Sequence, residues 1–219
     1  MHVPSLVDFL RGGWGISLCV AIDYTASNME PTNPSSLHYL SEFNQYEMAI
    51  HSVGRILEAY DSDNLIPVYG FGAIPRYMNE VNTNHCFPLN GVYPNPEVQG
   101  VNGILGCYRS TLHNIKFSGP TYFAPILKQM IQIVRLRLQE MSYHVFLILT
   151  DGEIHDMMET KDLVVEASEL PMSIIIIGVG KEKFKLMKEL DSDKQILRSS
   201  SGKAAQRDIV QFVKFKKFA

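Results

Sequence analysis

The chain has 219 residues, 46% of them hydrophobic and 20% charged, which is typical of one large globular domain with a substantial core. Its formal net charge is −3, so no overall basic field indicates a nucleic-acid-binding protein. The three cysteines form no Cys-x-x-Cys pair, which favours a reduced, intracellular protein. The start of the chain lacks a basic segment followed by a long apolar one, so we expect no secretory signal.

Strand-like and helix-like segments alternate along the first half of the chain. We assign residues 1–14 to an N-terminal extension and predict a strand over 15–23. Residues 65–71 predict a further strand, in which Pro67 indicates an edge or an end. Between these strands lies a helical pattern, whose apolar residues fall roughly on one face: Leu40, Phe43, Ile50, Val53, Ile56, Leu57 and Tyr60.

The second half begins with a loop-rich stretch, residues 72–99, which carries many Pro, Asn and Gly residues and one short predicted strand near Cys86 and Phe87. The apolar patterns after it predict helices and strands in alternation. In order, they are helices over 100–115 and 122–139, a strand over 144–150, a helix over about 158–169, a strand over 173–179, a short helix, a short strand over 195–198, and a last helix from Asp208.

These patterns predict an α/β fold with a doubly wound, mainly parallel sheet. Strands that are apolar on both faces are typical of a parallel sheet covered by helices on both sides. In such folds, ligands bind beyond the carboxyl ends of the strands, where the strand order reverses. We therefore look for functional residues where strands end.

Polar residues follow two of the predicted strands and precede one predicted helix. Asp23 ends the first strand, and Asp151 ends the strand over 144–150. If these two strands are neighbours, both carboxylates converge on one crevice. Thr121 stands at the predicted helix start, where its hydroxyl can cap the helix or reach the same point. Together, the predicted metal ligands are Asp23, Thr25, Ser27, Thr121 and Asp151.

Oxygen ligands without His or Cys suit Mg²⁺, Mn²⁺ or Ca²⁺. Two carboxylates roughly neutralise a divalent ion and three hydroxyls add no charge, so an open coordination position would favour an anionic oxygen from outside. Alternatively, Thr25 and Ser27 are turn residues that cap the next segment. His155, which has Asp151, Glu153 and Asp156 nearby in the sequence, is interpreted as part of a solvated loop.

The spacing Asp23-x-Thr25-x-Ser27, with the distant Thr121 and Thr150-Asp-Gly152, resembles the metal-ion-dependent adhesion site of von Willebrand factor A-type domains. Thr25 replaces the usual middle Ser of that motif but keeps the hydroxyl. More narrowly, several segments resemble the A-type domain of copines. They include Ala-Ile-Asp-Tyr-Thr-Ala-Ser-Asn (21–28), Ser36-Leu-His-Tyr39, Tyr60-Asp-Ser-Asp63, Gly119-Pro-Thr121, Leu147-Ile-Leu-Thr-Asp-Gly152 and Arg207-Asp-Ile-Val-Gln-Phe212.

The resemblance implies that residues 15–219 form a non-enzymatic protein-binding module. It would hold Mg²⁺ or Mn²⁺ and bind protein ligands that offer an Asp or Glu carboxylate. It also implies a longer, cytoplasmic, peripherally membrane-associated parent, whose calcium-dependent phospholipid-binding modules lie outside this chain. A plant-like parent with a zinc-bearing ubiquitin-ligase domain is a further possibility, although this chain has too few cysteines to hold that domain.

The alternative function is a metal-dependent hydrolase, such as a phosphatase, on the same kind of sheet. A common phosphatase class needs a second carboxylate two residues after the first. Thr25 stands in that position after Asp23, so this pair is missing.

Overall fold

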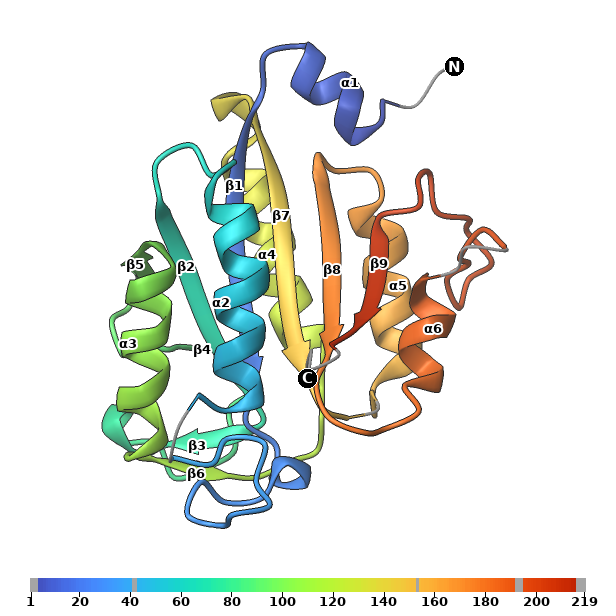
Figure 1. Ribbon diagram of the computed structural model, residues 1–219. Coiled ribbons are helices and arrows are strands. Elements are labelled where there is room, and N and C mark those ends of the chain that lie inside the picture. The colour runs from blue at the N-terminus through green and yellow to red at the C-terminus, as the bar shows by residue number, and fades with distance from the viewer. Residues whose placement is uncertain (1–3, 41–42, 153, 192–194, 216–219) are drawn as a thin grey trace.

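The computed structural model describes residues 4–40, 43–152, 154–191 and 195–215. A central sheet forms the middle layer, and helices cover both of its faces (Figure 1). The strands of this sheet are β1 (Gly15–Asp23), β2 (Leu65–Phe71), β4 (Phe87–Pro88), β5 (Glu97–Gln99), β7 (Ser142–Thr150), β8 (Met172–Gly178) and β9 (Val210–Lys214).

The strand order is β4-β2-β1-β7-β8-β9, with β5 also paired to β2. Neighbouring strands in the series β2-β1-β7-β8-β9 are parallel, whereas β4 and β5 run antiparallel to β2. The chain moves from β1 to one side of the sheet and later returns to build the other side from β7. The order therefore reverses at the β1–β7 pair, which confirms the predicted doubly wound α/β fold.

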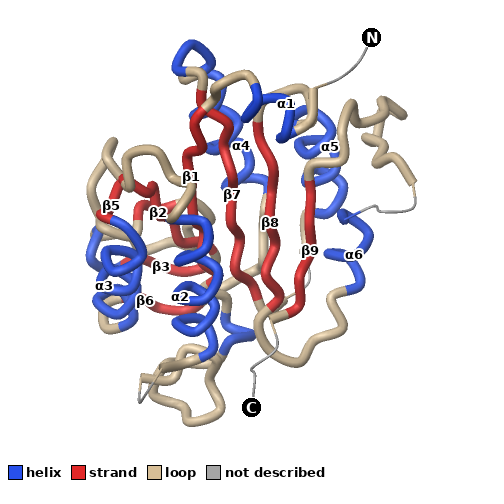
Figure 2. Tube along the Cα trace, turned by 45° about the horizontal axis from the view of Figure 1, so that its top comes forward, coloured by secondary structure: helices blue, strands red, loops and turns tan. Residues whose placement is uncertain are grey.

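Helices lie on each face of the sheet (Figure 2). One face is covered by α2 (Gln45–Glu58) and α3 (Gly100–Leu112), and the other by α4 (Ala124–Leu136), α5 (Met157–Ala167) and α6 (Lys185–Asp191). Smaller elements complete the chain: α1 (Leu6–Arg11), the 3₁₀ turns η1 (Ala26–Asn28), η2 (Arg76–Met78) and η3 (Leu138–Glu140), and the two-stranded sheet β3 (Ala73–Pro75) and β6 (Ile115–Phe117).

Both faces of the central strands are buried. Along β1, Val20 and Ile22 pack toward α2 and α3, while Cys19 and Ala21 pack toward α4, and all four are at most 3% exposed. Each fully buried Val, Leu or Ile side chain contributes about 1.5–3 kcal/mol of transfer free energy. This burial fixes β1 in the centre of the sheet and holds its last residue, Asp23, at a defined depth.

The predicted last helix is wrong, because the residues after Asp208 form β9. Val210 and Phe212 are buried, whereas Gln211 is exposed, so the segment alternates with the period of a strand. The same apolar residues also satisfy a short helical period, and only the parallel partner β8 decides between the two. The predicted strand over 195–198 is likewise reduced to a single bridge between Arg198 and Ala204.

The predicted helix after β1 exists, but its buried face differs from the expected one. Asn44 caps α2 and its side chain accepts a hydrogen bond from the Glu47 backbone N–H, so Leu40 and Phe43 precede the helix. The exposed fractions of Ile56 and Tyr60 are both 64%, whereas Tyr46, Ala49 and Ile50 are buried. The helix therefore turns toward the core the face that carries Tyr46, Ala49 and Ile50.

Other boundaries shift by a few residues. Helix α3 ends at Leu112 because residues 115–117 pair with β3, and α4 begins at Ala124, two residues later than predicted. The edge-or-end prediction for Pro67 is wrong, because Pro67 lies inside β2 and pairs with Glu97 of β5, although the pairing of β2 with β1 begins only at Val68. The proposed boundary at residue 15 remains a prediction.

Candidate metal centre

Asp23 lies at the carboxyl end of β1 and is completely buried. Its Oδ1 accepts hydrogen bonds from the backbone N–H of Thr25 (2.8 Å) and from the Thr25 hydroxyl (2.6 Å). Its Oδ2 accepts from the hydroxyl of Thr150, the last residue of β7 (2.5 Å). The two neighbouring strand ends are thus joined through one carboxylate.

Asp151 follows β7 directly and is 5% exposed. Its Oδ1 lies 2.9 Å from the hydroxyl of Ser27 and 3.0 Å from the side-chain nitrogen of Asn28, both of which donate to it. The hydroxyl oxygens of Ser27 and Thr25 are 3.0 Å apart. A continuous set of close polar contacts therefore connects four of the five predicted ligands.

Thr121 reaches the same place from the loop before α4. An added Cβ on Gly152 would lie 3.4 Å from the Thr121 hydroxyl and 3.8 Å from the Ser27 hydroxyl, so both oxygens surround Gly152. The Thr121 backbone is held by His155, whose N–H donates to the Thr121 carbonyl oxygen and whose Nδ1 accepts from the Thr121 N–H. The fold thus brings all five predicted residues to one end of β1 and β7.

Thr121 is not the helix cap, because the carboxylate of Asp156 accepts hydrogen bonds from the first free N–H groups of α4, those of Phe123 (3.0 Å) and Ala124 (2.8 Å). The segment around His155 is a loop and His155 itself is exposed, as the sequence predicted, but this loop also has a structural role. Ile154 in this segment is buried, and His155 and Asp156 hold Thr121 and the start of α4 in place. Glu153 lies outside the described residues.

The electrostatics of the cluster are unfavourable without a cation. Among the residues that the structure describes, no Lys, Arg or His forms an ion pair with Asp23 or Asp151. Burial raises the pKa of Asp23, and burial together with the charge of Asp23 raises the pKa of Asp151 to about 7. Two buried carboxylates that repel each other are stabilised by a positive charge between them.

The hydroxyl groups also have unused acceptor capacity. The only hydrogen of the Thr25 hydroxyl is donated to Asp23, and that of the Ser27 hydroxyl is donated to Asp151. Neither hydroxyl then has a hydrogen for the other, although their oxygens lie only 3.0 Å apart. Each hydroxyl oxygen therefore keeps lone pairs that it could donate to a metal ion.

The sequence analysis missed three residues that hold the cluster: Asn28, His38 and Thr150. The Nε2 of His38 lies 2.9 Å from the carbonyl oxygen of Asp23, which can only accept, so Nε2 carries the hydrogen. Nδ1 then accepts from the hydroxyl of Tyr108 (2.6 Å). Burial lowers the pKa of His38 to about 3, so the ring is neutral. The only signals for Asn28 and His38 in the sequence were the copine-like segments that contain them.

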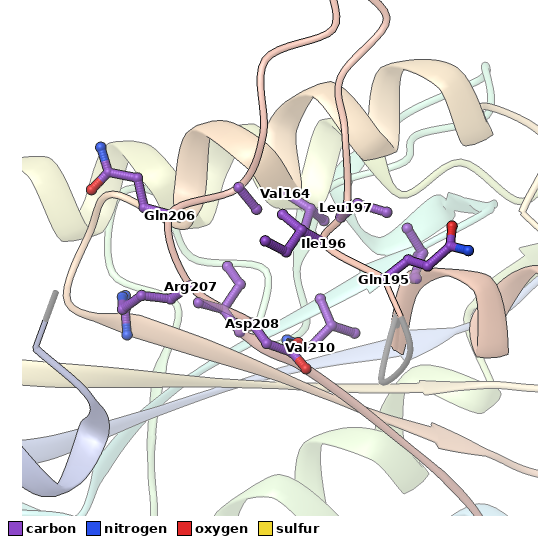
Figure 3. Close-up of a pocket in the computed structure, with 11 residues that line it drawn as sticks. Val164, Gln195, Ile196, Leu197, Gln206, Arg207, Asp208 and Val210 are labelled. Atoms are coloured by element: carbon purple, nitrogen blue, oxygen red, sulfur yellow. Dashed lines mark hydrogen bonds between the residues drawn. The ribbon is translucent and has the colours of Figure 1, made fainter.

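A hollow lies away from this cluster, between α5, α6 and β9 (Figure 3). It has a volume of about 430 Å³, and its lining includes Val164, Ile196 and Arg207 but none of the five predicted ligands. Figure 3 shows both apolar and polar side chains around it, such as Ile196 and Leu197 beside Gln195 and Asp208. Its lining therefore suggests no chemistry related to the metal prediction.

Within the described ranges, no group of three or more His, Cys, Asp or Glu side chains is arranged to hold a metal. The cluster at β1 and β7 has two carboxylates, and its other oxygens are hydroxyls, so it belongs to a different class of site. None of the described helices is long and apolar enough to cross a membrane.

Comparison with solved structures identifies the fold. The chain resembles manganese-loaded TRAP protein of Plasmodium vivax, with a TM-score of 0.57 and 12% identity over 92% of this chain and 69% of that one. It also resembles the von Willebrand factor A domain of SpRpn10, with a TM-score of 0.55 and 14% identity over 91% and 87% of the two chains. The chain therefore has the von Willebrand factor A-type fold.

Two curated relatives from Arabidopsis thaliana are much closer in sequence. BONZAI 1 is 46% identical over 215 residues and BONZAI 2 is 45% identical over 215, in each case 95% of this chain. The match covers 37% and 36% of the two relatives, so the chain spans little more than a third of their length. The family model for copines matches residues 36–219. The chain belongs to the copine family.

Proposed function

We propose that this chain is a protein-binding module that works through one bound Mg²⁺ or Mn²⁺ ion. The observation that carries the proposal is the pair of buried carboxylates without a cationic partner, joined by hydroxyl oxygens whose hydrogens are already donated. The proposed ligands, direct or through water, are Asp23, Thr25, Ser27, Thr121 and Asp151.

The dimensions fit a small divalent ion. Oxygen ligands lie about 2.1 Å from Mg²⁺, so adjacent corners of the octahedron are about 3 Å apart. The hydroxyl oxygens of Thr25 and Ser27 are separated by 3.0 Å. Each carboxylate accepts hydrogen bonds from one of these hydroxyls, which leaves the hydroxyl lone pairs for the ion. A bound ion would also remove the repulsion between Asp23 and Asp151.

The ion supplies an electrophilic position for an anionic oxygen. Two carboxylates roughly neutralise its charge, and neutral hydroxyls leave it able to accept one more ligand. A partner's Asp or Glu carboxylate is suited to that position, and Ser27 is exposed, so the cluster is accessible from solvent.

Calorimetry with Mg²⁺ and Mn²⁺ tests the metal assignment. We expect one ion per wild-type chain and no measurable binding to Asp23→Ala. Asp162→Ala is a matched control, because Asp162 is an exposed carboxylate on α5 that accepts hydrogen bonds from Ser200. Equal binding by wild type and Asp23→Ala would contradict the proposal.

Pull-down experiments test the partner assignment. Binding of a partner protein should be lost on chelation, restored by added Mg²⁺, and absent from Asp151→Ala. Retention by that variant and in chelator would show that partners use another surface. The same preparations should show no turnover of a fluorogenic phosphate with Mg²⁺. Turnover that Asp23→Ala abolishes would favour the hydrolase alternative.

We propose membrane association and a cytoplasmic location only for a longer parent protein. This chain spans little more than a third of the length of its two Arabidopsis relatives. The basic stretch 214–217 lies partly outside the described residues. It should give only weak, salt-sensitive adhesion to anionic lipid, since each basic side chain near such a surface contributes about 1 kcal/mol. Liposome sedimentation with and without calcium should show no calcium response, and a tight calcium-triggered association would contradict this assignment.

A further inference from the structure

Asn28 is a buried polar residue beside the cluster. It ends the 3₁₀ turn η1, and its side chain is completely buried. The side-chain nitrogen donates to Oδ1 of Asp151 (3.0 Å) and to the carbonyl oxygen of Thr25 (3.2 Å). These two hydrogen bonds use both amide hydrogens, so Asn28 links the loop after β1 to the loop after β7.

The two carboxylate oxygens of Asp151 differ in the hydrogen bonds that they accept. Oδ1 accepts from both Asn28 and Ser27, whereas no other residue that the structure describes donates to Oδ2. The carboxylate is thus held in one rotation, with Oδ1 directed to protein donors. Oδ2 is the oxygen left for an ion or for its water.

The main chain around Asn28 is itself fixed. Its carbonyl oxygen accepts from the Ser36 hydroxyl (3.0 Å) and from the Leu37 N–H (3.2 Å). The hydroxyl of Tyr46, from the first turn of α2, lies near the Asn28 side chain. The Tyr46 hydroxyl and the Asn28 Oδ1 are both buried without a well-formed hydrogen bond, yet Asn28 lies close enough to lower the pKa of Tyr46 against the larger effect of burial. The amide therefore has little freedom to rotate.

Resting on the proposed metal function, we propose that Asn28 determines which ion the centre prefers, by limiting Asp151 to one coordinating oxygen. Ca²⁺ takes six to eight oxygen ligands and often uses both oxygens of a carboxylate, whereas Mg²⁺ requires an octahedron of single oxygens. Two hydrogen bonds on Oδ1 oppose the two-oxygen mode and leave the one-oxygen mode unaffected. Asn28 acts through Asp151 and is a positioning residue for it.

The test measures the affinities of Mg²⁺ and Ca²⁺ for the 219-residue chain and its variants by calorimetry, and takes their ratio. Asn28→Leu has a similar size and removes both donors. We expect its preference for Mg²⁺ over Ca²⁺ to fall about tenfold, since outer-shell partners of metal ligands typically change affinity by 10–100-fold. Asn28→Asp keeps the shape but replaces the donor with an acceptor, and should shift the ratio further toward Ca²⁺.

Ser168→Ala is the matched control for lost stability. Ser168 is also fully buried, and its hydroxyl makes two hydrogen bonds to the main chain, with Val165 and Gln206, remote from the cluster. This variant should lose stability and keep the wild-type ion ratio. A second readout is the Mn²⁺ electron paramagnetic resonance spectrum, whose line shape should change in the Asn28 variants and not in Ser168→Ala.

The outcomes separate this proposal from the one on which it rests. If wild type binds neither ion, the metal function itself fails. If wild type binds Mg²⁺ and both Asn28 variants keep its ion ratio, Asn28 has no part in selectivity. If both Asn28 variants fail to fold under conditions where Ser168→Ala folds, the role of Asn28 is purely structural and the proposal is overturned.

Discussion

The two ends of the β1–β7 pair hold charged side chains in opposite ways. At the carboxyl end, Asp23 and Asp151 are buried together, and no cation among the described residues accompanies them. At the amino end, Arg207 donates to the carbonyl oxygens of Ser168 (3.2 Å), Leu170 and Met172 (3.3 Å). The guanidinium of Arg207 also lies over the rings of Phe9 and Tyr143, 5.9 Å from each centroid.

The difference between the two ends distinguishes a charge that stabilises the fold from charges that need a ligand. Every contact of Arg207 is made within the chain, and these contacts join α1, β7, β8 and the loop after α5 (Figure 1). The carboxylates at the other end have hydroxyl and amide donors, but no described residue forms an ion pair with them. A charge satisfied internally stabilises the fold, whereas an uncompensated pair of like charges needs a ligand.

The largest loss of stability is expected from a substitution at Arg207. Arg207→Met keeps part of the apolar stem but removes the guanidinium, so we expect a loss of about 3 kcal/mol in the free energy of unfolding. Urea denaturation measures the loss, and calorimetry should show unchanged Mg²⁺ affinity. Arg135→Met is the control, because Arg135 forms a largely exposed ion pair with Glu166 and should contribute under about 1 kcal/mol. Equal losses in the two variants would contradict the structural role of Arg207.

Removing one of the two charges at the carboxyl end should raise the free energy of unfolding, in contrast to the loss expected at Arg207. Asp151→Asn removes a charge that is destabilised mainly by burial and also by repulsion from Asp23, so the metal-free protein should gain about 2–4 kcal/mol at pH 8, in line with a pKa raised to about 7. The variant should also lose the increase in melting temperature that Mg²⁺ gives to wild type. Asp162→Asn should show no gain, since hydrogen bonds from Ser200 hold the pKa of Asp162 below its usual range. A destabilised Asp151→Asn would contradict the argument.

The pH dependence of stability and of Mg²⁺ affinity should reveal the same destabilised carboxylate. The folded-state pKa of Asp151 is raised above its unfolded value, so the destabilisation is absent below about pH 4, grows as pH rises, and is complete above about pH 7. An ion must displace the bound proton below pH 7, so Mg²⁺ affinity should be about tenfold weaker at pH 6 than at pH 8. Affinity that stays constant across this range would contradict the coupling of the two carboxylates.

Stability itself must be compared between wild type and Asp151→Asn, because two histidines oppose the trend. Burial lowers the pKa of His38 to about 3 and that of His144 to about 4. Both stabilising contributions are lost as pH falls below the unfolded value near 6.5. The difference between the two proteins cancels this effect and leaves the contribution of residue 151.

Much of the fold followed from the sequence because its strands are apolar on both faces. The runs that became β1, β7 and β8 are long, rich in Ile and Val, and bounded by polar residues, which leaves few alternatives. The segment that became β9 has only five residues and one buried face, so its period alone could not separate strand from helix. Its partner strand decided the outcome.

The candidate site was predictable where a residue type reveals its chemistry. Asp23 and Asp151 stand at strand ends, and the strand order then brings them together. Asn28 and His38 act through contacts with residues distant in sequence, namely Asp151 and Tyr108. No local pattern distinguishes a buried Asn that holds a ligand from one that closes a turn. Three-dimensional contacts were needed to find them.

The smallest expected effect concerns Thr25, which stands where the resembled adhesion-site motif has its middle Ser. Its hydroxyl makes the hydrogen bond to Asp23, and this bond does not need the methyl group. That methyl group lies where a Cβ on Gly72 would collide with it, and Gly72 has a positive φ of +78°. Thr25→Ser should therefore keep the Mg²⁺ affinity within about twofold and cost about 1 kcal/mol for the lost methyl contact.

Thr25→Val provides the complementary variant. It keeps the branched shape beside Gly72 and removes the hydroxyl, so Asp23 loses a buried donor. Metal affinity should fall at least tenfold, as expected when a proposed ligand oxygen is deleted. Calorimetry on the two variants separates oxygen from shape at one position. If Thr25→Val binds Mg²⁺ as tightly as Thr25→Ser, then residue 25 shapes the turn, and the ion, if bound, is held by the other oxygens of the cluster.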